Sequence, residues 1–259
     1  MNGRSPLRFG TGLRALLIGL VAGLGGGLFS LGGGTLTIPL MMAWLGLNSF
    51  AARGTALAAA LFPALMGTWM YHRADQVDWW AVLVIAVPAT VLTPLVGLWT
   101  ERLRDGRLRQ AFGAVVITGA LMLILRDELL GAWAITGEAR WFYLAGVGIV
   151  EGLVAGSVGI SGGPVLAPLL VMGLGMPQQL AQGCSLASRV PAVIAGSLEN
   201  LRCGHVRFRL LPGLVVGGLV GAWLGSRLAL SLAELHLRSL FALVLIGIGL
   251  RYLRGQKAT

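Results

Sequence analysis

Residues 23–47 read GLGGGLFSLGGGTLTIPLMMAWLGL, and this stretch decides the fold because a long apolar run stops within it at a cluster of glycines. A short apolar run that contains a proline follows the cluster. The same arrangement returns at residues 154–175, which read VAGSVGISGGPVLAPLLVMGLG. Glycine permits positive φ angles and close backbone approach, so each cluster predicts the end of one helix and the start of another.

The composition places the chain in a membrane. Of its 259 residues, 56% are hydrophobic and 12% are charged, whereas soluble domains carry about 25% charged residues. The 40 glycines show no Gly-x-y period, and the apolar content is too high for disorder. The net charge of +10 lies in short clusters between apolar runs, which indicates membrane topology rather than a surface for nucleic acid.

Apolar runs follow one another in the same order in both halves of the chain. The first half holds runs 13–31, 35–47, 51–71, 79–99 and 108–125, and the second half holds runs 141–158, 164–176, 179–201, 210–230 and 235–253. Runs of eighteen or more residues can cross a hydrocarbon core of about 30 Å. Runs 35–47 and 164–176 are too short for this, and we expect tilted or re-entrant half-helices there.

The two halves are related in sequence. A shift of 129 residues places Gly33 and Gly34 on Gly162 and Gly163, and the match continues with about thirteen identities over residues 33–77. Paired glycines, a proline and an arginine in register are not expected from apolar composition alone. We therefore predict an all-α polytopic membrane protein built from two repeats, residues 1–128 and 139–259, joined by a loop at 129–138. Each repeat is expected to hold three to four spanning helices and one short broken or re-entrant helix, or about eight to ten hydrophobic segments in total.

Basic clusters predict the orientation of the repeats. Arginines gather before the first run, at residues 102–109, at residues 202–209 and at the C-terminal end, and the positive-inside rule places all four clusters in the cytoplasm. The segment between the halves carries Asp127, Glu128 and Glu138 and is expected outside. Each half then has three crossings plus a hairpin, or another odd number, so the second half is inverted. The first run lacks a cleavage site and is expected to be retained.

Inverted repeats with broken helices are typical of secondary transporters, which bind substrate near the bilayer midplane. Irregular backbone at that depth is tolerated only where protein buries it or where it lines a watery cavity, and the unpaired N–H groups of a helix start suit an anion. We therefore expect the two breaks to meet as hairpin tips around one anion. Close helix packing is the alternative for any glycine, and for Gly19, Gly23 and Gly27 it is the interpretation that we prefer.

Two ionisable residues fall inside apolar runs, where charge is costly. Arg189 lies about ten residues into run 179–201, and its fork of donors suits an oxyanion. Glu151 lies at similar depth in run 141–158 and is a candidate for coupling transport to protons. A structural Arg–Glu pair without a role in transport is the alternative. Arg53 matches Gln182 in the repeat and is either part of the site or a headgroup anchor.

Small polar residues near the breaks complete the predicted substrate site, although hydroxyls in helices commonly bond to the preceding turn. The full predicted set is Ser30, Gly32, Gly33, Gly34, Thr35, Arg53, Thr55, Ser157, Ser161, Gly162, Gly163, Gln182, Cys184, Ser185 and Arg189. No catalytic residue, metal ligand or cofactor is predicted, because His72, His205 and His236 stand singly and no enzyme motif occurs.

The two breaks, with ARGTALAAALFPALMG at 52–67 and QGCSLASRVPAVIAG at 182–196, resemble the TauE/SafE family of 4-toluene sulfonate uptake permeases. The resemblance covers nearly the whole chain and includes Val77-Asp78-Trp79 at a helix start. It implies a transporter of sulfur-containing anions, such as sulfite or organosulfonates, in a prokaryotic cytoplasmic membrane. Cys184 and Arg189 depart from the family pattern, in which threonine and small or apolar residues are common at these positions.

The sequence therefore predicts a secondary transporter for a small anion such as sulfite or sulfoacetate. It is expected to be a multi-pass protein of the inner membrane with both termini in the cytoplasm, to work by alternating access and to be coupled to protons. An anion channel and a membrane sensor or scaffold without transport are the alternatives. The expected partners are the anion and the lipid bilayer, without nucleic acid, and nothing in the sequence indicates an oligomeric state.

Overall fold

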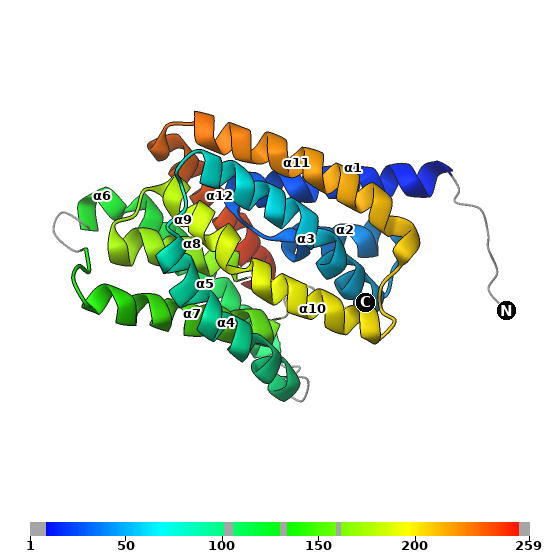
Figure 1. The fold of residues 1–259 in the computed structure, drawn as a ribbon, viewed down its shortest axis with the longest axis horizontal. Helices are drawn as coiled ribbons and strands as arrows, with labels where there is room; N and C mark the ends of the chain where they lie inside the picture. Colours follow the sequence, from blue (N-terminus) through cyan, green and yellow to red (C-terminus); the bar gives the residue numbers. More distant parts are fainter. Residues whose placement is uncertain (1–8, 101–105, 130–133, 159–161, 254–259) are drawn as a thin grey trace.

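The computed structural model describes residues 9–100, 106–129, 134–158 and 162–253, and the regular secondary structure in these residues is helical (Figure 1). The elements of the first half are α1 (Phe9–Phe29), α2 (Gly33–Leu45), α3 (Ser49–Arg73), α4 (Trp79–Thr100), α5 (Gly106–Ile124) and the short α6 (Arg126–Leu129). Those of the second half are α7 (Ala139–Val158), α8 (Gly163–Leu174), α9 (Gln178–Ser188), α10 (Val190–Arg202), η1 (Phe208–Leu210), α11 (Leu211–Ser231) and α12 (Glu234–Leu253).

Five helical segments in the described residues are long and apolar enough to cross a membrane. They lie at Gly10–Phe29, Ser49–Arg73, Trp79–Val96, Phe208–Ser231 and Glu234–Leu253. The outer face of α4 illustrates their character, since Leu83, Val87 and Val91 are all more than half exposed. Residues of this kind on an outer face suit lipid rather than water. The all-helical, polytopic class predicted from the sequence is thus confirmed, with fewer long spans than predicted.

Helix bounds in the second half follow those in the first half at the same offset of 129 residues. Helix α3 covers residues 49–73, and α9 and α10 together cover residues 178–202. The short helices α2 and α8 begin at Gly33 and Gly163, directly after the two predicted breaks. These bounds fit the duplication inferred from the sequence.

One expectation about these bounds is wrong. Run 179–201 is not one helix, because Arg189 forms a turn that separates α9 from α10. Pro191 explains the interruption, since it lacks a backbone N–H, its ring clashes with the carbonyl four residues earlier, and it disfavours helical geometry in the preceding residue. Arg189 therefore lies at a helix break rather than within a continuous helix.

Glycines allow α1 and α11 to pack with their backbones in contact. A Cβ added at Gly27 would lie 2.8 Å from the backbone nitrogen of Ser226, and one at Gly19 would lie 2.9 Å from that of Gly218. Residues later in α1 thus meet residues later in α11, so the two helices run parallel. The interpretation of Gly19, Gly23 and Gly27 as packing residues is confirmed.

Contacts of glycines also give the relative directions of two further pairs of helices. Glycines at 148, 152 and 156 of α7 meet successive turns of α4 from Ile85 to Val96, so α4 and α7 also run parallel. Gly113 of α5 meets Tyr252, whereas Gly249 of α12 meets Ile117, so α5 and α12 run antiparallel.

Contacts between loops define the two ends of the molecule. At one end, which we call the basic end, Arg207 N–H donates to Thr55 Oγ1 and Arg14 donates to the Trp44 carbonyl oxygen. At the opposite end, Arg140 pairs with Asp78, and Arg126 pairs with Glu234 at 2.5 Å.

Two helical hairpins enter the molecule from these ends. Helices α1 and α2 both have their outer ends at the basic end, where Arg14 meets Trp44. Helices α7 and α8 have theirs at the opposite end, where Ile135 N–H donates to the Gly173 carbonyl oxygen. The largest apolar core cluster includes Leu166 and Leu170 of α8 and Phe241 of α12, which are all buried. The hairpin tips are the two glycine breaks.

Candidate functional site

Arg189, in the turn between α9 and α10, is the centre of a buried polar cluster. Its side chain is 8% exposed. Its Nε donates to the Ser185 carbonyl oxygen at 2.7 Å, and its Nη2 donates to the Ser30 carbonyl oxygen at 2.5 Å. Nη2 also lies 3.0 Å from Ser30 Oγ and 3.3 Å from Ser185 Oγ. The guanidinium thus joins the first break to the second half of the chain.

The two breaks meet at Ser30 and Gly163. Ser30 is fully buried and has a φ of 52°, in the left-handed region that serine rarely adopts. Its hydroxyl donates to Ser185 Oγ at 2.9 Å. A Cβ at Gly163 would collide with the Ser30 carbonyl oxygen and would lie 2.6 Å from Arg189 Nη1. Only glycine at 163 permits this approach, which brings Ser30 of the first break against the start of α8.

Glu151 of α7 is the acidic member of the cluster. It is 3% exposed, and its Oε1 lies 3.8 Å from Arg189 Nε. Neither carboxylate oxygen has a hydrogen-bond partner among the described residues. Gly162 packs beside it, since a Cβ there would lie 2.7 Å from Glu151 Cγ. Burial without hydrogen bonds disfavours the charged form of a carboxylate.

This chemistry suits an oxyanion. A guanidinium binds planar or tetrahedral oxyanions through parallel N–H donors, and the Ser185 hydroxyl, which accepts hydrogen bonds from Ser30 and Arg189, can donate its own O–H. Glu151 partly neutralises Arg189 at a distance too long for a hydrogen bond. Buried charges in a membrane are costly, so by default such a pair indicates a functional site.

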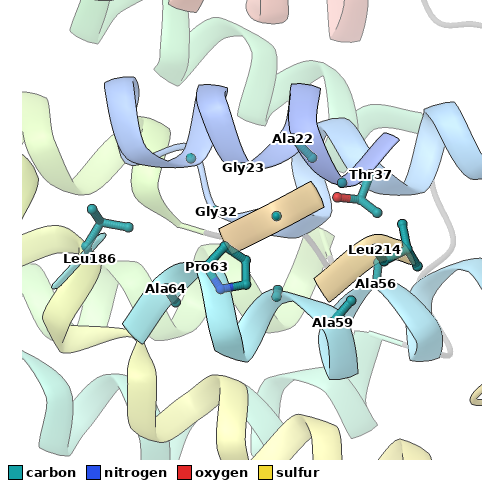
Figure 2. Close-up of a pocket in the computed structure, with 14 residues that line it drawn as sticks. Ala22, Gly23, Gly32, Thr37, Ala56, Ala59, Pro63, Ala64, Leu186 and Leu214 are labelled. Atoms are coloured by element: carbon teal, nitrogen blue, oxygen red, sulfur yellow. The ribbon is translucent and has the colours of Figure 1, made fainter. Parts of the chain in front are cut away.

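A narrow pocket lies beside this cluster, between α1, α3 and α11, at the start of α2 (Figure 2). Gly32, the N-cap residue of α2 with a φ of 71°, lies in its wall together with Thr37. Leu186 closes one end of the pocket and directly follows Ser185 in α9. The pocket and the charged cluster therefore share both the first break and α9.

The pocket and the charged cluster occupy equivalent positions in the two halves. At the offset of 129 residues, the positions of Glu151, Ser185, Ser188 and Arg189 correspond to four alanines in the first half. All four alanines line the pocket: Ala22, Ala56, Ala59 and Ala60. Small side chains thus leave space in the first half where polar side chains fill the second half.

Several predicted site residues lie outside the cluster because their polar groups bond locally or to other loops. Thr35 and Ser157 donate to carbonyl oxygens of the preceding turn, at 2.8 and 3.3 Å. Thr55 Oγ1 accepts a hydrogen bond from a loop N–H at the basic end. Cys184 Sγ accepts one from Asp78 N–H at 3.3 Å. Their positions suit structural roles.

The remaining predicted residues lie at the pocket, at the start of α2, at the basic end and on α9. Gly32 faces the pocket, and Gly33 and Gly34 form the first turn of α2. Arg53 is exposed near the basic end. Gln182 is buried on α9, where its Oε1 accepts a hydrogen bond from Tyr71 at 2.8 Å. Ser161 lies outside the described residues.

Sequence reasoning missed two buried polar residues, one near the end of α3 and one at the start of α9. Tyr71 is fully buried, and its hydroxyl also lies 3.0 Å from the Gly27 carbonyl oxygen next to the first break. Gln178 is fully buried, and its side-chain amide has no partner among the described residues. Both residues stand at the ends of apolar runs, where a polar side chain usually meets the headgroups. Tyr71 differs from such a headgroup anchor by its contact with Gln182 of α9, and Gln178 differs by its complete burial.

Comparison with known proteins identifies the family of the chain. Residues 15–252 match the family described as "Sulfite exporter TauE/SafE". The chain is 30% identical over 240 residues to a probable membrane transporter protein of Xylella fastidiosa, with 90% of each chain covered. It is 26% identical over 265 residues to the probable membrane transporter protein YunE of Bacillus subtilis, with 92% of this chain and 96% of that protein covered.

Similarity extends to an archaeal protein, the probable membrane transporter protein MJ0441 of Methanocaldococcus jannaschii, at 23% identity over 252 residues. In that comparison, 91% of this chain and 92% of the relative are covered. These relatives are transporters and not enzymes by name, and they come from prokaryotes. The chain is therefore a multi-pass membrane protein that belongs to the TauE/SafE sulfite exporter family.

Proposed function

We propose that the protein is a secondary transporter for a small oxyanion, such as sulfite or an organosulfonate, and that Arg189 binds the anion. One observation carries the proposal. A buried guanidinium stands at the contact of two glycine breaks, with two serine hydroxyls and an unbonded carboxylate around it. Such a cluster is costly in a membrane unless it binds a ligand or couples transport.

Alternating access is supported by the arrangement of the halves. Helix bounds repeat at an offset of 129 residues, and the hairpins α1–α2 and α7–α8 enter from opposite ends. Two inverted repeats around a central site would allow the site to open first to one end and then to the other. The pocket in the first half and the packed cluster in the second half fit one of two such states.

A direct test is flux into liposomes that contain the purified protein, with sulfite, sulfate, thiosulfate and sulfoacetate as separate substrates. The proposal expects saturable uptake of at least one of them, and faster uptake when the same anion is present inside. Conductance that rises without saturation would indicate an anion channel. No flux of any of the four would indicate a sensor or scaffold and would overturn the proposal.

A further inference from the structure

We propose that Glu151 and the transported anion compete for Arg189, so that the anion binds only when Glu151 takes up a proton. This inference rests on the proposed function and adds its coupling. It assigns one proton-binding site to the same cluster, and it makes the carrier a proton–anion symporter.

The geometry leaves Glu151 dependent on Arg189. The two side chains are 2% and 8% exposed, and Oε1 lies 3.8 Å from Nε. Since neither carboxylate oxygen accepts a hydrogen bond from the described residues, the guanidinium is the group that offsets the charge of Glu151. An oxyanion that binds Arg189 would place a second negative charge beside an already poorly stabilised carboxylate.

The described helices that pack around Glu151 place no second charged side chain beside it. Helices α4 and α8, which pack against α7, contain no ionisable residue, and the arginines of α5 lie in its first turn. In α9, the ionisable Cys184 lies against Asp78 at the opposite end. Within α7 itself, Arg140 pairs with Asp78, and Tyr143 donates to the Leu169 carbonyl oxygen. Among the described residues, Arg189 is the charged side chain that lies within ion-pair distance of Glu151.

The binding step is a proton transfer together with an exchange of ion pairs. A proton from water adds to one oxygen of Glu151, whose carboxylate then becomes a neutral acid. The anion takes the place of that carboxylate as the partner of Arg189, and the Ser30 and Ser185 hydroxyls can turn toward it. Release reverses both events, so the proton and the anion leave together.

The asymmetry of the two halves limits the coupling to one proton for each transported anion. The positions equivalent to Glu151 and Arg189 are Ala22 and Ala60, and both line the apolar pocket. The first half therefore offers no second carboxylate–guanidinium pair at the equivalent place.

Calorimetry on the unaltered protein tests this directly. Binding of sulfoacetate is measured at alkaline pH in buffers of different ionisation enthalpy, with thiosulfate as the probe if flux selects an inorganic anion. Neither probe titrates under these conditions, so any proton taken up belongs to the protein. Uptake of one proton for each bound anion is expected. Binding without proton uptake would overturn the inference.

Flux measurements separate this inference from the proposed function. A pH gradient should drive accumulation in the unaltered protein, whereas Glu151→Gln should retain exchange of internal for external anion and lose the accumulation. Glu199→Gln, at an exposed position on α10, is the matched control and should behave like the parent. Accumulation by Glu151→Gln under a pH gradient would show that Glu151 does not couple transport to protons, and the proposed transport function would be unaffected. Absence of saturable flux in the parent would instead defeat the proposed function.

Discussion

At the scale of single residues, Arg189 links three parts of the chain, because it donates to Ser30 beside the first break and to Ser185 of α9 and lies near Glu151 of α7. Arg189 and Glu151 each lie deep in an apolar run of the sequence, and their side chains lie 3.8 Å apart. Their contact depends on how α7 and the α9–α10 turn pack, which one sequence does not encode locally. Thr55 and Cys184 follow the same polar pattern but bond to loops far along the chain. Sequence spacing cannot separate these two outcomes.

Substitution of Arg189 tests its role in binding. Arg189→Lys keeps the charge but loses the fork of donors, and we expect the affinity for the anion to fall about tenfold, or about 1.4 kcal/mol. Arg189→Leu should lose saturable uptake whether or not Glu151 is present. Concentration series of uptake in liposomes measure both effects.

The double variant Arg189→Leu with Glu151→Leu is the decisive control. If Arg189 only neutralises Glu151, removal of both charges should preserve transport, because replacing a buried pair by apolar residues is often nearly neutral. Normal transport by the double variant would exclude anion binding by Arg189.

The two breaks should differ in their tolerance of a methyl group. Gly163→Ala should abolish flux, because its Cβ would collide with the Ser30 carbonyl oxygen and crowd Arg189. Gly34→Ala, at the equivalent position of the first half, is the matched control, since its nearest neighbour would be Ile38 Cδ1 at 3.6 Å. Initial uptake rates, corrected for the amount of inserted protein, measure the difference. Equal rates in both variants would contradict the contact between the breaks.

At the scale of helices, glycine spacing serves two different purposes in this chain. In α1 and α11 the glycines remove side chains from a parallel helix contact, and in the breaks they end one helix and begin the next. The sequence distinguished these uses correctly, because packing glycines recur every four residues whereas break glycines cluster before a proline-containing run. The interruption at Arg189 does not stand out in the sequence, because Pro191 lies within an apolar run and the prolines within the runs of α3 and α4 leave those helices continuous.

Stability should depend on the contact between α1 and α11. Gly23→Ala would press a methyl group onto the backbone of Gly218, and we expect a loss of about 1–3 kcal/mol from such overpacking. Gly26→Ala, on the same helix, meets nothing within 4 Å and should leave the thermal midpoint of the purified protein unchanged. If both variants melt at the same temperature as the parent, the close contact is wrong.

At the scale of the whole molecule, the two ends differ in charge, and the positive-inside rule relates such a difference to orientation in the membrane. Arg14, Arg53, Arg202, Arg207 and Arg209 lie on segments at the basic end, whereas Asp78 and Glu234 pair with arginines at the opposite end. Helix bounds and the hairpin arrangement were predictable because hydropathy and glycine clusters mark them. The contacts of Ser30 with Ser185 and Arg189 were not, because they join residues 155 and 159 positions apart.

The orientation leads to a prediction for the loops between α4 and α5 and between α10 and α11. Helix α4 begins beside the Asp78–Arg140 pair at the opposite end and runs toward the basic end, and the 102–109 cluster follows α4 in the sequence. The α10–α11 loop lies at the basic end through the bond of Arg207 to Thr55. We therefore expect both loops in the cytoplasm, by the positive-inside rule. Labelling of single cysteines with a membrane-impermeant maleimide measures this.

The chain supplies its own reporter for that measurement, because Cys203 is exposed at the end of α10 and Cys184 is buried. Cys203 should react in inverted vesicles and not in intact cells. Arg104→Cys in a Cys203→Ser background should react from the same side, because both loops follow helices that end at the basic end. Glu138→Cys in that background is the matched control and should react from outside, because residue 138 precedes α7 at the opposite end. Reaction of the reporters at 104 and 203 from opposite sides would reverse one half relative to the other, and the inverted hairpins around Arg189 would then lose their basis.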